Sequence, residues 1–237
     1  MNKPEISPAQ TAIQVAFGFI SARALYVAAK LGVADHLKDS PKSAVELATA
    51  LSVQPDALYR IMRVLAASGV FVLDRNDRFS LNEIGDTLRA TSAQSVRDYV
   101  IMYHEIIYPP YDHIVSTVRT GESGRLKASG RTTFELVKTD PGFAAAVYAG
   151  LACRAKLDIA ALMAAYDFSD AEFVADIGGG NGGLLSAILA RCPNLSGLLF
   201  DLAPAIDAAK AGKGGPLPRC EYCARCDWSR FPNRRLQ

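Results

Sequence analysis

Five glycines and two aspartates are the residues of this chain whose types and spacing suit the binding of a ligand. The glycines follow an apolar run that predicts a strand and precede a helical pattern, and they lie at Gly178, Gly179, Gly180, Gly182 and Gly183. Glycines at this place let the backbone turn sharply and let a ligand approach without a Cβ in the way. Asp176 precedes them, and Asp201 ends a second apolar run 23 positions after Gly178. A carboxylate there suits the hydroxyls of a ribose, so the stretch predicts a nucleoside-binding strand, turn, helix and strand.

The same glycines satisfy two nucleoside-binding templates. Gly178, Gly180 and Gly183 fit the dinucleotide pattern G-x-G-x-x-G. Asp176 with Gly178, Gly180 and Gly182 fits D-x-G-x-G-x-G, the pattern of S-adenosylmethionine (SAM) methyltransferases. A tight turn that binds nothing is the third interpretation, because a glycine pattern alone has low specificity.

The longer stretch DIGGGNGGLLSAILARCPNLSGLLFDL resembles the SAM-dependent small-molecule O-methyltransferases, such as caffeate, hydroxyneurosporene and polyketide O-methyltransferases. The resemblance covers most of residues 10 to 222. It implies an α/β fold with an α-helical winged-helix N-terminal domain and a Rossmann-like SAM-binding domain. It also implies SAM as cofactor and a small hydroxylated acceptor of aromatic, polyketide or carotenoid type. The cofactor-binding residues that it implies are Asp176, Gly178, Gly179, Gly180, Gly182 and, at the ribose, Asp201.

Composition excludes several other classes of protein. Half of the 237 residues are apolar, which is ample for a buried core, and the formal charge of +2 gives no general attraction to nucleic acid. The polar first ten residues do not resemble a secretory leader, and we expect no stretch to approach the 18 apolar residues of a membrane span. These features predict a cytoplasmic protein. The odd number of cysteines argues against a disulfide framework.

A long apolar helix is predicted from Ser7 to about Gly32. Ile13, Phe17 and Ile20 form an apolar face on it that no obvious part of the chain covers. Such a face cannot stay exposed alone, so the sequence predicts a homodimer through the N-terminal helices.

Helices predicted between Val33 and Ser68, followed by a hairpin about Asp74 to Asp77, indicate a winged helix. This module makes a DNA-binding regulator an alternative function, with Arg60 and Arg63 on the reading helix. Residues 1–90 hold ten Lys or Arg against nine Asp or Glu, whereas a DNA-binding face is strongly basic. The resembled family uses the module for dimerisation and as one wall of the acceptor pocket.

Helices with a break at Pro109 and Pro110 are predicted for residues 94–120, and residues 121–133 are predicted to form a loop. At helical spacing the aromatic residues of this segment favour a core position. The resemblance makes Tyr103 and His104 candidates for contact with the acceptor.

The predicted domains are a winged-helix dimerisation domain (1–93), a helical connector that walls the acceptor site (94–165), a partial SAM-binding domain (166–222) and an aberrant tail (223–237). The family's catalytic His, within an H-D-W sequence, has no counterpart, so we expect a C-terminally truncated protein without catalytic residues that is inactive alone. A non-catalytic SAM-binding or dimerisation partner is the alternative. Cys220, Cys223 and Cys226 have the spacing of zinc or iron–sulfur ligands. No metal site is predicted, because these cysteines lie where the family pattern ends.

Overall fold

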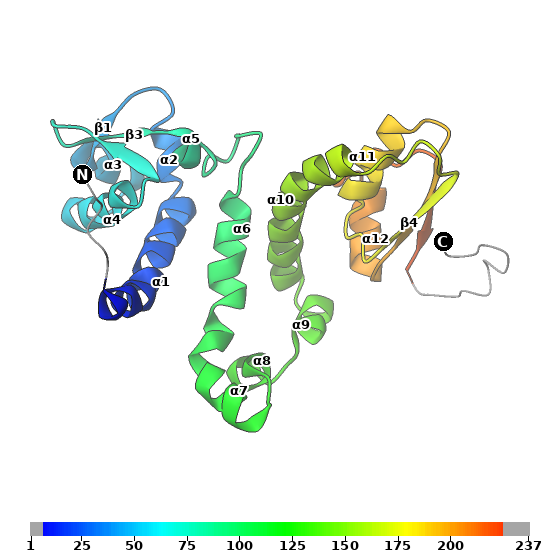
Figure 1. The fold of residues 1–237 in the computed structure, drawn as a ribbon, viewed down its shortest axis with the longest axis horizontal. Helices are drawn as coiled ribbons and strands as arrows, with labels where there is room; N and C mark the ends of the chain where they lie inside the picture. The colour runs from blue at the N-terminus through cyan, green and yellow to red at the C-terminus, as the bar shows by residue number, and fades with distance from the viewer. Residues whose placement is uncertain (1–6, 225–237) are drawn as a thin grey trace. The chain divides into compact units, whose positions relative to one another are not determined.

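A computed structural model describes residues 7–224 of the chain (Figure 1). It divides into two compact units, Met1–Ala128 and Ser129–Gln237. The predicted domain boundaries after residues 93, 165 and 222 stay predictions. Cys226 and the rest of the predicted tail beyond residue 224 lie outside the described residues.

The first helix has the ends that the sequence predicts. Helix α1 spans Pro8–Leu31; Ser7 and Gln10 form a capping box at its start, and Gly32 ends it at a φ of 69°. A Ser side chain satisfies the free N–H groups of a first turn, and glycine adopts the left-handed conformation without strain.

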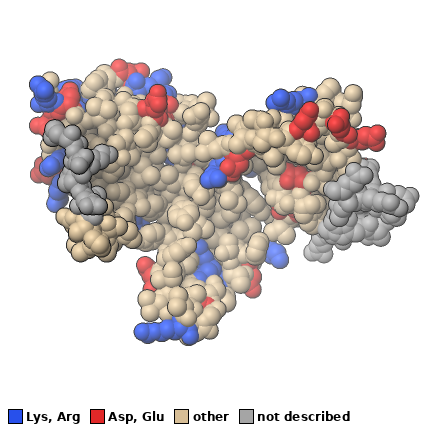
Figure 2. Space-filling view, in the orientation of Figure 1, with Lys and Arg blue, Asp and Glu red and all other residues tan. Residues whose placement is uncertain are grey.

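By length and composition, α1 is the one helix of the described part that is long and apolar enough to cross a membrane. The expectation that no stretch approaches such a span is therefore wrong. Much of the helix surface is uncovered within this chain, and Figure 2 shows a surface without charges over its start. Its exposed apolar side chains are Ile13, Val15, Phe17, Phe19 and Ile20.

A helical core with a small sheet completes the N-terminal half of the first unit, in the order predicted for a winged helix. The helices are α2 (Val33–His36), α3 (Ala44–Leu51), α4 (Pro55–Ala67) and α5 (Glu83–Asp86), and the strands are β1 (Lys42–Ser43), β2 (Phe71–Leu73) and β3 (Arg78–Leu81). Strands β2 and β3 form the predicted hairpin, and β1 pairs antiparallel with the other side of β3. Phe71 and Phe79 from this sheet are fully buried against Leu47, Met62 and Leu65 of the helices.

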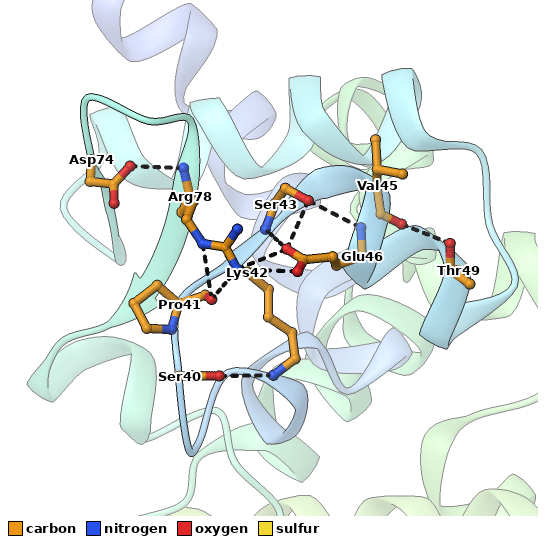
Figure 3. Close-up of polar contacts among 9 residues, drawn as sticks. All are labelled: Ser40, Pro41, Lys42, Ser43, Val45, Glu46, Thr49, Asp74 and Arg78. Atoms are coloured by element: carbon orange, nitrogen blue, oxygen red, sulfur yellow. Dashed lines mark hydrogen bonds and ion pairs between the residues drawn. The ribbon is translucent and has the colours of Figure 1, made fainter.

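Polar contacts join the hairpin of β2 and β3, which is the wing of the winged helix, to α3 (Figure 3). Glu46 accepts hydrogen bonds from the backbone N–H of Ser43 (2.7 Å) and from its hydroxyl (2.9 Å), and it lies 3.0 Å from Arg78 of β3. Arg78 also donates to the carbonyl oxygen of Pro41 at 2.8 Å. Ser43 and Glu46 form the capping box of α3, and through Arg78 this capping box also fixes the position of the sheet.

The helices that follow are irregular at the predicted proline break. They are α6 (Arg97–Met102), a π-turn η1 (Tyr103–Ile107), a 3₁₀ turn η2 (Pro109–His113), α7 (Ile114–Thr120) and α8 (Gly124–Ser129). Helix α8 lies inside the predicted loop 121–133, so that prediction is wrong for these residues. The hydroxyl of Ser123 accepts from the N–H of Arg125 at 3.2 Å, and Lys127 pairs with Glu122 at 3.2 Å. These contacts offset the weak helix propensity of the glycines and serines.

The second unit is an α/β structure with a parallel sheet, as predicted for a partial Rossmann-like domain. Its helices are α9 (Thr133–Thr139), α10 (Pro141–Ala165), α11 (Gly183–Arg191) and α12 (Ala203–Lys210), and its strands are β4 (Phe173–Ile177), β5 (Ser196–Phe200) and β6 (Cys220–Cys223). The strand order is β4-β5-β6, with both pairs parallel. The core between sheet and helices includes Leu185, Leu189, Leu195, Leu199 and Ile206.

Candidate functional site

Parallel pairing brings the two predicted carboxylates to one edge of the sheet. Asp176 lies opposite Leu199 near the end of β4, and Asp201 directly follows β5. The N–H of Gly178 donates to the carbonyl of Phe200 at 2.8 Å, which ties the start of the glycine turn to the end of β5. In open parallel sheets, ligands bind at this carboxyl edge of the strands.

The turn between β4 and α11 requires glycine for two different reasons. Gly178, Gly180 and Gly182 have φ angles of 78°, 60° and 80°, a region that side chains disfavour. A Cβ at Gly179 would lie 2.5 Å from the carboxyl group of Asp176. No atom lies within 4 Å of a Cβ built at Gly178 or Gly180, so the backbone there faces open space. The turn has room for a ligand to approach its backbone.

Asp201 is fixed by the turn that it faces. Its Oδ2 accepts from the N–H of Gly180 at 2.7 Å, and its Oδ1 accepts from the N–H of Leu202 at 2.6 Å. A carboxylate oxygen can accept more than one hydrogen bond. Asp201 therefore keeps capacity for a pair of hydroxyl donors.

Asp176 is the unusual carboxylate of the site. Its Oδ2 is buried and has no hydrogen-bond partner in the part of the chain that the structure describes. Burial raises the pKa of Asp176 and the nearby Asp201 raises it further, while the backbone N–H of Leu185 acts in the opposite direction. A buried polar atom without a partner is rare in a native structure and is common where a ligand or water completes the site.

Two residues at this edge were missed by sequence analysis. Tyr148 of α10 is close enough to Asp201 that the carboxylate adds to burial in raising the pKa of its hydroxyl. No sequence signal marks Tyr148, because it lies on a helix that precedes the sheet. Asn181 accepts from the N–H of Gly183 at 3.3 Å and donates to the carbonyl of Lys213 at 3.4 Å. Because Asn181 lies between Gly180 and Gly182, the sequence could have indicated that it belongs to the site.

The two acceptor candidates belong to the first unit and differ in environment. Tyr103 is exposed, whereas His104 is buried. The His104 ring stacks on Tyr26 and Tyr108 at centroid distances of 5.2 and 5.7 Å, and its Nδ1 lies 3.1 Å from the carbonyl oxygen of Val100. Because a carbonyl only accepts, Nδ1 carries a proton, and Nε2 is the ring nitrogen that can accept a hydrogen bond. Among the described residues Nε2 has no hydrogen-bond partner.

Residues 7–224 contain no group of three or more His, Cys, Asp or Glu side chains arranged to hold a metal ion. Cys220 and Cys223 lie on β6, and Cys226 falls outside the described residues. The possible cysteine ligand set stays a hypothesis.

The glycine turn and its carboxylates suit a nucleoside. They offer open backbone at the start of a helix, a fixed carboxylate for hydroxyls and a second, buried carboxylate oxygen that has no partner among residues 7–224. Family comparisons agree. Residues 13–91 match the O-methyltransferase dimerisation domain, and residues 111–221 match the O-methyltransferase domain.

Individual relatives and solved structures point the same way. The phenazine O-methyltransferase of Lysobacter antibioticus is 34% identical over 88% of this chain and 62% of its own length. The crystal structure of LaPhzM has a TM-score of 0.84 and 32% identity, and the match covers 93% of this chain and 67% of that one. The structure of NcsB1 from neocarzinostatin biosynthesis, with SAM and 2-hydroxy-5-methyl naphthoic acid, has a TM-score of 0.68 and 30% identity over 87% of this chain and 65% of that one.

The chain thus spans about three fifths of the length of the curated relatives that it matches.

Proposed function

This chain belongs to the SAM-dependent O-methyltransferases, and we propose that its second unit binds SAM as the methyl donor for the hydroxyl group of an aromatic small molecule. The observation that carries the proposal is the edge formed by β4 and β5. There the glycine backbone is open, and Asp201 is held in place by the N–H of Gly180 (2.7 Å). In this proposal Asp201 accepts from the ribose hydroxyls, and Asp176 with Gly178–Gly182 lines the rest of the nucleoside site.

Isothermal titration calorimetry with SAM, its demethylated product and NAD tests this assignment. We expect binding of SAM and of the product, with NAD at least about tenfold weaker. Asp201→Ala removes the acceptor and is expected to abolish the heat of binding. Asp207→Ala is the matched control, because Asp207 is an exposed carboxylate on α12. Equal or tighter binding of NAD would reject the SAM assignment.

SAM supplies an electrophilic methyl group on a positively charged sulfur. The residues described here contribute binding and orientation, which favour in-line attack by holding the reacting groups close and aligned. A general base that takes the hydroxyl proton contributes typically 10²–10⁴-fold in rate. None of the three histidines of the chain, His36, His104 and His113, belongs to the second unit. The role that we propose for His104 is to position the acceptor through a hydrogen bond and not to remove its proton.

We therefore propose that the 237-residue chain alone binds SAM without measurable turnover, as a non-catalytic partner would. The assay is transfer of a labelled methyl group to a panel of phenolic and polyketide hydroxyl acceptors. Turnover that is lost in Asp201→Ala but kept in Asp207→Ala would show that the chain supplies its own base, contrary to this proposal.

For the acceptor, we propose contacts from Tyr103 and His104. The buried Nε2 of His104, which has no partner in the described part of the chain, supports a hydrogen bond from the acceptor hydroxyl. With 2-hydroxy-5-methyl naphthoic acid as the probe, His104→Gln is expected to weaken binding about tenfold. His36→Gln is the control, and equal affinities for the two variants would exclude His104 from the acceptor site.

We propose that the protein is a cytoplasmic homodimer in which the exposed apolar side chains of α1 form the interface. The match of residues 13–91 to the dimerisation domain supports this role for α1 over a membrane span. Sedimentation is expected to show a dimer that Phe17→Glu converts to a monomer. Val45→Glu places the same charge at an exposed site on α3 and should leave the dimer intact. A folded wild-type monomer would disprove the interface.

A further inference from the structure

The carbonyl oxygen of Ile106, in the π-turn, lacks the partners that its own helix normally supplies. Those partners are the N–H groups three, four or five residues later, in a 3₁₀, α or π arrangement. Here the first two positions are Pro109 and Pro110, which have no N–H. The N–H of Tyr111 donates to Tyr108 instead, at 2.9 Å. Because Ile106 is buried, its carbonyl needs another donor.

Arg125 of α8 is that donor. Its Nη2 donates to the carbonyl oxygen of Ile106, and the guanidinium is half-buried, which lowers its pKa. Gly124 permits the approach, because a Cβ there would overlap the carbonyl oxygen of Pro110 and lie 3.4 Å from Oγ1 of Thr117. The start of α8 therefore packs directly on the proline break.

The turn that Arg125 contacts also carries His104. The N–H of Tyr108 reaches back five residues to the carbonyl of Tyr103 at 2.8 Å, and this wider turn places the rings of His104 and Tyr108 in a stack with an interplanar angle of 9°. Arg23 of α1 lies 4.0 Å from the centroid of Tyr108. The orientation of the His104 ring thus depends on the geometry of the turn.

We propose that Gly124 and Arg125 are positioning residues that hold the π-turn and thereby keep His104 stacked between Tyr26 and Tyr108. In this position Nε2 of His104 can accept a hydrogen bond from the hydroxyl group of the acceptor. Only the role of Nε2 toward the acceptor rests on the proposed function. The position of His104 is a property of the first unit that can be measured without any ligand.

The test is nitrogen NMR of the imidazole rings in the untagged chain, in which His104→Gln assigns one of three histidines. Arg125→Ala is expected to remove the Nδ1–H signature of His104, and ethylguanidinium should restore it. Arg119→Ala, an exposed arginine on α7, is the matched control. An unchanged His104 spectrum in Arg125→Ala would overturn the proposal.

Two further variants keep the proposal testable if Arg125→Ala does not fold. Arg125→Lys keeps a donor and should retain the His104 spectrum, whereas Gly124→Ala pushes α8 from Pro110 and should change it. Unchanged spectra in both of these variants would also overturn the proposal. If the spectrum of Gly124→Ala or Arg125→Ala changes but 2-hydroxy-5-methyl naphthoic acid binds neither variant nor wild type, the positioning role is supported and only the acceptor role of Nε2 is rejected.

Discussion

Two carboxylates show how the units differ. Glu46 in the first unit accepts hydrogen bonds from the backbone and the hydroxyl of Ser43 and pairs with Arg78, and these contacts hold its pKa to about 2 (Figure 3). Asp176 in the second unit has a buried oxygen without a partner among the described residues, and burial and Asp201 raise its pKa. Glu46 holds elements of the fold together. Burial disfavours the charged form of Asp176, whose oxygen without a described partner is part of the proposed nucleoside site.

Glycines show the same contrast. Gly32 and Gly121 in the first unit end helices, where a left-handed residue is needed. Gly178 and Gly180 also have positive φ and, like Gly121, have no atom within 4 Å of a built Cβ, but they follow the carboxyl end of a strand instead of ending a helix. Polar groups that have all their partners within the chain indicate a structural role. Polar groups that lack partners at the edge of a sheet indicate a candidate binding site.

The largest effect that we expect concerns the core of the first unit. Phe79 is completely buried, so Phe79→Ala should lower the free energy of unfolding by about 3–5 kcal/mol. Val72→Ala on the neighbouring strand, where the side chain is half-exposed, should cost less than about 1 kcal/mol. Urea unfolding measures both. Similar losses for the two variants would show that the sheet of this unit does not form its core.

The second expected effect is a gain in the free energy of unfolding instead of a loss, because we expect the burial of Asp176 to destabilise the second unit. Asp176→Asn should raise the stability of the second unit by about 1 kcal/mol at a pH above the raised pKa of Asp176, since burying a neutral amide costs less than burying a charge. The same change should weaken SAM binding about tenfold. Asp207→Asn should alter neither urea unfolding nor the calorimetric titration. If Asp176→Asn loses stability, Asp176 has a structural role like that of Glu46.

Much of this contrast could be predicted from the sequence, because its signals are local. Capping residues Ser7 and Ser43 and the left-handed Gly32 fix helix ends through neighbours a few positions away. The glycine run and the two aspartates are also a local pattern, and parallel strand pairing is enough to bring Asp176 and Asp201 to one edge.

What could not be predicted depends on partners distant in sequence. Strand β1 is two residues long and exists through its pairing with β3. Helix α8 is stabilised partly by the contact of Arg125 with Ile106, 19 positions earlier. Tyr148 reaches the neighbourhood of Asp201 through packing of α10, and no spacing rule encodes that.

A smaller effect tests the capping box that holds the wing. Ser43→Ala removes the hydroxyl that accepts from the N–H of Glu46 (3.2 Å), and we expect a loss of about 1 kcal/mol in the stability of the first unit. Ser40→Ala is the control, because Ser40 is exposed and its side chain makes only one long contact, of 3.4 Å with Lys42, within the described residues. Equal unfolding midpoints for the two variants would mean that the capping box does not stabilise α3.

The smallest effect is a difference in pH dependence between the two carboxylates. The pKa of Glu46 is lowered from 4.5 to about 2, so its stabilisation is complete above pH 4.5 and is lost as the pH falls toward 2. The pKa of Asp176 is raised above 3.8, so its favourable contribution is present below pH 3.8 and is lost as the pH rises through the folded value.

Urea unfolding across this acid range should therefore show the advantage of wild type over Glu46→Gln shrinking on acidification. The disadvantage of wild type relative to Asp176→Asn should shrink in a different window, as the pH falls through the raised pKa of Asp176 toward 3.8, because protonation removes the buried charge. Parallel curves for wild type and Asp176→Asn would mean that Asp176 titrates alike in the folded and unfolded chain, which would leave no cost of its burial for a ligand to relieve.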